Sequence, residues 1–156
     1  MIEIEIPGYE KFIFKKAFFD LNGTLSIDGI IKSSTYNLLK ELSKKIEINI
    51  ITADTLNVAS TLFKNLNVNL IKLKNLNGGK EKAEIVEKNE PEHCVAFGNG
   101  YNDHLMLEKV KLGIIVLQEE GISIKSLLNA DIIVKNIDDG IMLLLNEKRL
   151  IATLRR

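Results

Sequence analysis

The sequence predicts an α/β fold with three layers: a doubly wound, Rossmann-like and mostly parallel sheet with helices on both faces. One observation predicts the sheet, and a second predicts a hairpin in front of it. Short apolar runs alternate with longer amphipathic segments along the 156 residues, and this alternation is typical of parallel strands joined by helices. The turn-forming stretch Pro7-Gly8-Tyr9-Glu10 separates the first two apolar runs. These two runs are therefore expected to pair as an N-terminal β-hairpin extension.

The expected elements follow one another in the order that such a fold requires. The expected strands are Ile2–Ile6, Phe12–Phe19, Ile46–Ile51, Val68–Ile71, Cys94–Phe97, Gly113–Leu117 and Ile132–Val134. The expected helices are Ser34–Lys45, Leu56–Leu66, Lys80–Lys88, Asn102–Lys109, Ile122–Asn129 and Ile137–Leu145, and Lys148–Arg156 is expected to form a closing helix or an edge segment. Ser33 or Ser34 can cap the first helix, and Asp54 or Thr55 the second. The connections are short and no repeat divides the chain, so residues 1–156 are predicted to form a single domain.

Composition excludes several classes of function. The chain has 21 basic and 21 acidic residues and therefore no net charge, which disfavours broad electrostatic binding to nucleic acid or to an anionic membrane surface. Its longest apolar stretch, Leu112 to Leu117, is far shorter than the about 18 residues that span a bilayer.

A single cysteine, Cys94, is compatible with a reducing compartment, and the start of the chain lacks a signal-peptide pattern. We expect a cytoplasmic protein, and the absence of net charge favours self-association into a homo-oligomer.

Polar side chains follow four of the predicted strands, at the edge of a parallel sheet where ligands bind. Asp20 directly follows the first strand of the sheet and Thr52 follows the next. Lys80 begins a helix after the third, and Asp103 ends a glycine-rich loop after the fourth. An aspartate, a threonine, a lysine and a second aspartate at one edge are the parts needed to move a phosphoryl group through an aspartyl phosphate.

Each part has a chemical reason. Asp20 would attack phosphorus, while a divalent cation between the two carboxylates would neutralise charge on the phosphoryl oxygens. The Thr52 hydroxyl would donate to a phosphate oxygen, and Lys80 would supply a compact positive charge in the transition state. Oxygen ligands without a cysteine or histidine cluster favour Mg²⁺ over zinc.

The order of these residues resembles the haloacid dehalogenase (HAD) superfamily, whose motifs run Asp-x-Asp-Gly-Thr, then Ser or Thr, then Lys, then a glycine-rich acidic loop. Asp20-x-x-Gly23-Thr24-Leu25 and Gly98-x-Gly100-x-Asn102-Asp103 look most like the phosphorylation domain of P-type ATPases, and the whole chain resembles the soluble P-type ATPase-like proteins. The resemblance implies a catalytic set of Asp20, Asn22, Thr52 and Lys80, phosphate contacts from Gly23, Thr24, Thr52, Ala53, Lys80 and Asn102, and Mg²⁺ ligands from Asp20, Asn22, Asn99 and Asp103. Asn22 would ligate through its backbone carbonyl.

Two asparagines depart from the pattern of the superfamily. Asn22 stands where most of its phosphatases carry a second aspartate as general acid and base, and an amide cannot exchange a proton near neutral pH. Loss of such a group costs about 100- to 10,000-fold in rate, so we expect slow turnover or a long-lived phosphoenzyme. Asn99 stands where the acidic loop usually begins with aspartate. Its amide oxygen can ligate a metal with one negative charge fewer, so metal affinity should fall.

The segment Leu25 to Lys32 has room for only a small hairpin, so no cap domain is expected over the site. Specificity would then come from a neighbouring subunit or from a large substrate, and the phosphorylated substrate can be a small molecule or a macromolecule. Two functions stay open: a Mg²⁺-dependent phosphohydrolase acting through Asp20, and a phosphate-binding or regulatory module with little turnover. A two-component receiver domain is disfavoured, because there the acidic residues precede the phosphorylated aspartate, whereas Asp103 comes last.

Overall fold

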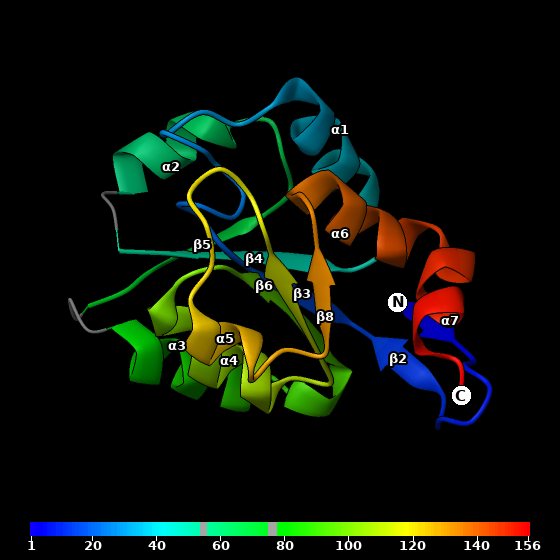
Figure 1. The fold of residues 1–156 in the computed structure, drawn as a ribbon. Helices are drawn as coiled ribbons and strands as arrows, with labels where there is room; N and C mark the ends of the chain where they lie inside the picture. Colours follow the sequence, from blue (N-terminus) through cyan, green and yellow to red (C-terminus); the bar gives the residue numbers. More distant parts are fainter. Residues whose placement is uncertain (54–55, 75–77) are drawn as a thin grey trace.

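The computed structural model describes the chain except residues 54–55 and 75–77 and the side chains of residues 56–58. A six-stranded sheet lies between two layers of helices (Figure 1), with the strand order β5-β4-β3-β6-β7-β8 and parallel pairing throughout. The strands are β3 (Lys16–Asp20), β4 (Glu47–Thr52), β5 (Asn69–Lys72), β6 (Cys94–Gly98), β7 (Leu112–Val116) and β8 (Ile132–Val134). The predicted doubly wound α/β fold is confirmed.

Helices cover both faces of the sheet. One face carries α1 (Ser33–Leu42), α2 (Leu56–Leu62) and α6 (Ile137–Leu145), and the other carries α3 (Gly78–Glu87), α4 (His104–Lys109) and α5 (Ile124–Leu127). Phe19 packs into the apolar core of the first face and Phe18 into that of the second. Because strands covered on both sides have no solvent-facing positions, they are continuously apolar and do not alternate with polar residues.

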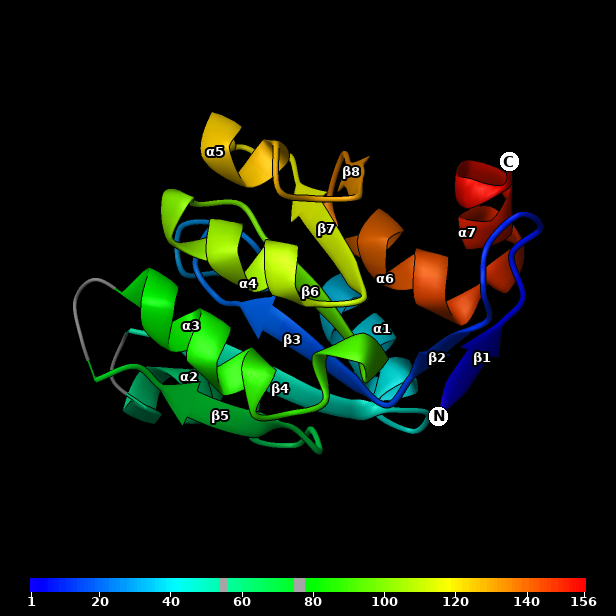
Figure 2. The same cartoon turned by 90° about the horizontal axis from the view of Figure 1, so that it is seen from below.

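An antiparallel hairpin precedes the sheet, as predicted, and projects from one end of it (Figure 2). Its strands are β1 (Ile2–Ile4) and β2 (Phe12–Phe14). The single strand predicted over Phe12 to Phe19 is split at Lys15, whose backbone N–H donates to His93 O at 2.9 Å. This bond lies outside both sheets, so the chain leaves the hairpin there and enters the main sheet as β3.

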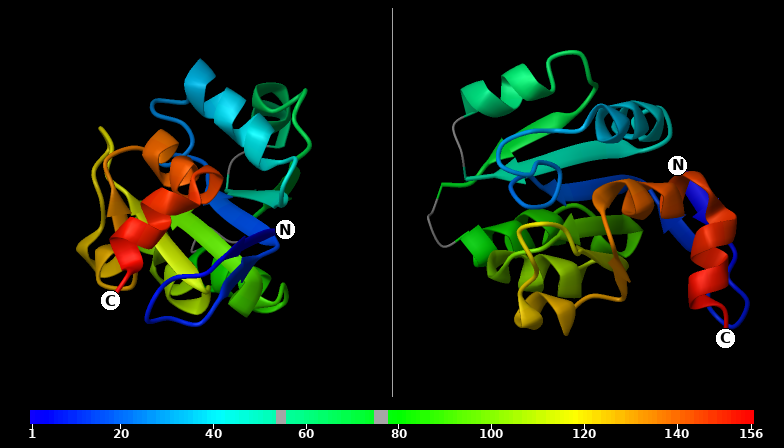
Figure 3. Two further views of the ribbon diagram at one scale, coloured as in Figure 1. Left: turned by 90° about the vertical axis from the view of Figure 1, so that its right-hand side faces the viewer. Right: turned by 45° about the horizontal axis from the view of Figure 1, so that its top comes forward.

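The C-terminal stretch forms a closing helix, α7 (Glu147–Leu154), alongside the hairpin (Figure 3). The Arg156 guanidinium lies 4.2 Å from the centre of the Tyr9 ring, and the Arg156 N–H donates to Pro7 O. No helix in the described part of the chain is long and apolar enough to cross a membrane.

The predicted cap of the first helix does not hold. The first helix begins at Ser33, and its N-cap is Lys32, in extended conformation and without a side-chain capping bond. Ser33 and Ser34 are therefore helical residues and do not cap it. Asp54 and Thr55, the predicted caps of α2, lie outside the described residues. Between Leu25 and Lys32 the described chain holds a tight turn closed by an Ile27–Ile30 bridge, and no cap domain is inserted there.

Candidate functional site

The carboxyl ends of three adjacent strands bring predicted residues to one edge of the sheet. Asp20 ends β3 and lies in register with Ile51, so Thr52 follows one residue later at the end of β4. On the other side, Phe97 of β6 is in register with Phe19, which places Gly98 beside Asp20 and the glycine-rich loop just beyond it. The expected convergence of Asp20, Thr52 and the glycine-rich loop at one edge of the sheet is therefore observed.

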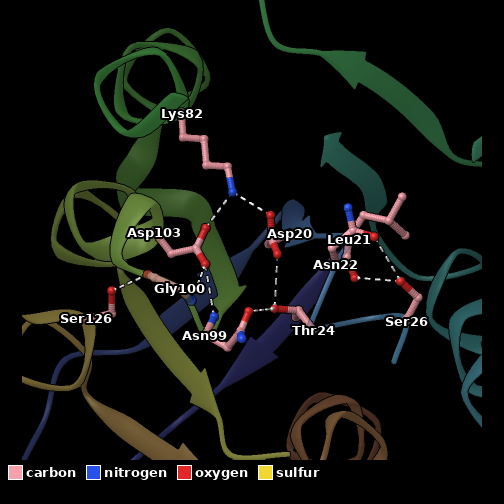
Figure 4. Close-up of polar contacts among 10 residues, drawn as sticks. All are labelled: Asp20, Leu21, Asn22, Thr24, Ser26, Lys82, Asn99, Gly100, Asp103 and Ser126. Carbon is pink, nitrogen blue, oxygen red and sulfur yellow. Dashed lines mark hydrogen bonds and ion pairs between the residues drawn. The ribbon is translucent and has the colours of Figure 1, made fainter. Parts of the chain in front are cut away.

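A buried lysine joins the two aspartates (Figure 4). Lys82 Nζ lies 2.5 Å from Asp20 Oδ1 and 2.6 Å from Asp103 Oδ1, and its side chain is 1% exposed. Lys80, which the sequence analysis placed here, is exposed, and that prediction is wrong. The buried residues of α3 include Gly78, Lys82 and Val86, spaced four apart along one face. Lys80 lies two residues from this stripe and so points away from it.

The buried charges shift the pKa values of Asp20 and Lys82. Burial and the negative charge of Asp103 raise the pKa of Asp20, Lys82 opposes both effects, and the net result is a pKa of about 7. Burial alone would lower the pKa of Lys82, but the two carboxylates outweigh burial and raise it. The lysine is therefore positively charged at neutral pH, whereas Asp20 takes up a proton when the pH falls below neutral.

Asp103 organises the glycine-rich loop. Its Oδ2 accepts hydrogen bonds from the backbone N–H groups of Asn99 and Gly100, both at 2.9 Å. A Cβ at Gly98 would lie 2.5 Å from Asp103 Cγ, so only glycine leaves room for the carboxylate. Both oxygens of Asp103 accept hydrogen bonds, Oδ1 from Lys82 and Oδ2 from the two loop amides.

Thr24 links Asp20 to Asn99. Its hydroxyl oxygen lies 3.1 Å from Asn99 Oδ1 and 3.4 Å from Asp20 Oδ2. Asn99 Nδ2 donates to Gly121 O at 3.2 Å, which fixes the amide with its oxygen toward the Thr24 hydroxyl. These oxygens are the donors that a small hard cation would use.

Asn22, which is expected to replace an aspartate acting as general acid and base, lies at the surface. Its Oδ1 accepts a hydrogen bond from Ser26 Oγ at 3.4 Å, and Figure 4 shows this contact on the far side of the turn from Lys82. The turn itself is fixed by Gly23, whose φ of +79° suits glycine. A Cβ at Gly23 would lie 2.5 Å from Asn99 Nδ2 and 2.8 Å from Glu120 Oε2.

The other predicted phosphate contacts lie around this edge. Thr52 is buried at the end of β4, and Ala53 is exposed next to it. Asn102 is exposed in the 3₁₀ turn Tyr101–Asp103 before α4. Sequence reasoning missed Lys82 and also missed Gln118, whose side chain binds the backbone of the turn after β3. The spacing of four residues between Gly78, Lys82 and Val86 on α3 was a signal for Lys82. Nothing local in the sequence distinguishes Gln118.

Comparison with known proteins found one curated relative and several similar structures, and no family model matches the sequence. The uncharacterized protein MJ0073 of Methanocaldococcus jannaschii is 47% identical over 72 residues, which are 46% of this chain and 77% of that protein.

Three solved structures illustrate the structural similarity. The 3-deoxy-D-manno-octulosonate 8-phosphate phosphatase of Moraxella catarrhalis, in complex with magnesium, phosphate and KDO, superposes with a TM-score of 0.69 and 21% identity over 91% of this chain and 94% of that chain. The cobalt-bound deoxy-D-mannose-octulosonate 8-phosphate phosphatase of Haemophilus influenzae gives a TM-score of 0.66 and 12% identity over 84% of this chain and 88% of that chain. A structure from Legionella pneumophila assigned to HAD subfamily III A gives 0.63 and 18% over 90% and 88%. At these identities the similarity establishes a shared fold.

Proposed function

Because the chain belongs to the same family as MJ0073 and has the fold of the HAD superfamily, we propose that it is a Mg²⁺-dependent phosphohydrolase acting through an aspartyl phosphate on Asp20. One observation carries the proposal. Asp20 ends β3 between the Lys82 ammonium and the Thr24 hydroxyl, and Asp103 forms a second ion pair with Lys82. A carboxylate at a strand end with a positive charge beside it supports the proposed attack by Asp20.

The residues divide the chemistry between them. A carboxylate oxygen of Asp20 would attack phosphorus, the bond from phosphorus to the leaving oxygen would break, and water would later hydrolyse the aspartyl phosphate to release phosphate. Lys82 would stabilise negative charge on the transferring group. With Asn22 at the acid and base position, the leaving oxygen and the attacking water must exchange their protons with solvent, which slows both steps.

The donor set fits a small divalent cation. We assign Asp20, the Asn99 amide oxygen and the backbone carbonyl of Asn22 to Mg²⁺, with Asp103 acting through Lys82 and the loop amides. The orientation of Asn99 supports this assignment, because its Nδ2 is held by Gly121 O and its oxygen accepts from the Thr24 hydroxyl, which also reaches Asp20. When bound, the ion would neutralise charge on Asp20 and on the phosphoryl oxygens.

A second candidate function is a phosphate-binding or regulatory module with little turnover. The side chain of Asn22 binds Ser26 at the surface, and Asn99 replaces a charged metal ligand with a neutral one. Under either proposal the ligand is a phosphorylated small molecule or macromolecule, and we retain the expectation of a cytoplasmic homo-oligomer.

The test is release of phosphate from acetyl phosphate or p-nitrophenyl phosphate with Mg²⁺, compared between the wild type and Asp20→Asn. Activity that disappears in the variant, together with a phosphoryl adduct seen by intact-protein mass spectrometry in the wild type, supports the phosphohydrolase. A variant that keeps the rate would disprove the mechanism. Thermal stabilisation by phosphate without any release favours the binding module.

A further inference from the structure

The loop after β7, residues 117–123, joins the turn after β3 to the start of α6. Its central contact is made by Gln118. Gln118 Nε2 donates to Gly23 O at 3.0 Å and to Thr24 O at 2.8 Å, and Gln118 Oε1 accepts from the Ile137 backbone N–H at 3.1 Å. One half-buried carboxamide therefore connects three segments that are far apart in the sequence.

The same loop also holds the glycine-rich loop. Ser123 N–H donates to Asn99 O at 2.8 Å, and Gly121 O accepts from Asn99 Nδ2. On its outer side, Glu120 Oε1 accepts from the Asp28 N–H at 3.3 Å. The loop after β7 thus contacts the backbone on both sides of Asp20, and a movement of this loop would move Thr24 and Asn99 together.

We propose that Gln118 is a positioning residue for the phosphoryl site. It fixes the carbonyls of Gly23 and Thr24, and so holds the Thr24 hydroxyl against Asp20 and Asn99. Glutamine suits this place because its amide offers two N–H donors for two adjacent carbonyls and one acceptor on the opposite side. Glutamate has the same length but has no N–H to donate, and methionine has a similar shape with neither group.

The inference rests on the proposed function, in which the turn after β3 contacts the phosphoryl group. Displacing a catalytic group by about 1 Å can cost about 100-fold in rate. We therefore expect kcat to fall about tenfold in Gln118→Met, which loses the hydrogen bonds, and about 100-fold in Gln118→Glu, which turns an oxygen toward two carbonyls.

The experiment measures three quantities for both variants: kcat with p-nitrophenyl phosphate and Mg²⁺, the Kd of inorganic phosphate by calorimetry, and the unfolding temperature. Rates and affinities are measured well below the unfolding temperature. Glu119→Gln is the matched control on the same loop, because Glu119 is exposed and pairs with Lys32 at 3.8 Å on the surface, and it should match the wild type.

A lower kcat together with a phosphate Kd raised about tenfold in folded protein supports the inference. A lowered unfolding temperature with kcat and Kd within about twofold of wild type overturns it, because that is the result of a purely structural contact. If Gln118→Glu does not fold, Gln118→Met decides. If the wild type binds phosphate but hydrolyses nothing, the proposed function fails, while the phosphate Kd of the variants still tests Gln118.

Discussion

Replacing Lys82 with methionine would remove the one positive charge between two buried carboxylates. Its ammonium lies within hydrogen-bonding distance of both Asp20 and Asp103. Removing one partner from a buried ion pair costs about 3–5 kcal/mol, because the remaining charge stays buried without compensation. We expect Lys82→Met to lose at least this much of the free energy of unfolding at pH 8. That is a large part of the about 5–15 kcal/mol typical of a domain.

Urea unfolding at pH 8 and pH 5.5 tests the reasoning, with Lys80→Met as the control because Lys80 is exposed on the same helix. Asp20 has a raised pKa of about 7, and a carboxyl with a raised pKa stabilises the folded state once it is protonated. The penalty in Lys82→Met should therefore shrink at pH 5.5, and adding Asp103→Asn should recover part of it at pH 8. Equal losses in the two lysine variants, or no loss in Lys82→Met, would refute the argument.

Three further predictions concern the metal, the proton and the turn. Because the pKa of Asp20 is raised to about 7, Mg²⁺ must displace a proton at lower pH; its stabilising effect in thermal unfolding should be larger at pH 8 than at pH 6, and a pH-independent effect would contradict this. Asn22→Asp should raise phosphate release toward the about 100-fold that a general acid supplies, and no gain would mean that residue 22 is not at the acid and base position. Gly23→Ala should cost about 1–3 kcal/mol in chemical unfolding, because φ is +79° and its Cβ would contact Asn99; an unchanged midpoint would show that the turn relaxes.

The position of the site followed from topology, which the sequence encodes strongly. Strands that are covered on both faces read as continuous apolar runs, so the ends of β3, β4 and β6 could be located to within a residue or two. Parallel pairing then places those ends at one edge. Asp20, Thr52 and Asp103 could be brought together on this ground, before any side-chain contact was known.

The lysine could not be located in the same way, because its direction depends on helix phase. Gly78-Gly79-Lys80-Glu81-Lys82 offers two lysines two residues apart, and these point to different sides of a helix. The glycines leave the start of the helix undefined from sequence alone. The choice depends on the apolar residues Ala83 and Val86, which are buried with Lys82. Anchoring the phase on them would have selected Lys82.

Contacts between loops could not be predicted from the sequence. Gln118 binds Gly23 and Thr24 across 94 to 95 residues of sequence, and no periodicity or turn signal relates these positions. The split of the first long strand at Lys15 has the same origin, because it depends on a bond to His93. Such contacts are set by how separate elements meet in three dimensions, and local propensity carries no information about them.

Asn22 and Asn99 make the candidate site less negative than aspartates at these positions would. When Asp20 is ionised, Asp20, Asp103 and Lys82 together carry two negative charges and one positive. Aspartates at positions 22 and 99 would attract the metal more strongly, but they would also repel a phosphate group, which carries up to about two negative charges near neutral pH. Under the proposed function, the amides would favour phosphate binding at a given metal occupancy, while Asn22 would not supply the proton transfer that turnover needs. Asn99→Asp should accordingly tighten Mg²⁺ binding and weaken phosphate binding without Mg²⁺, whereas Asn22→Asp should speed turnover, so the two substitutions separate binding from catalysis at one site.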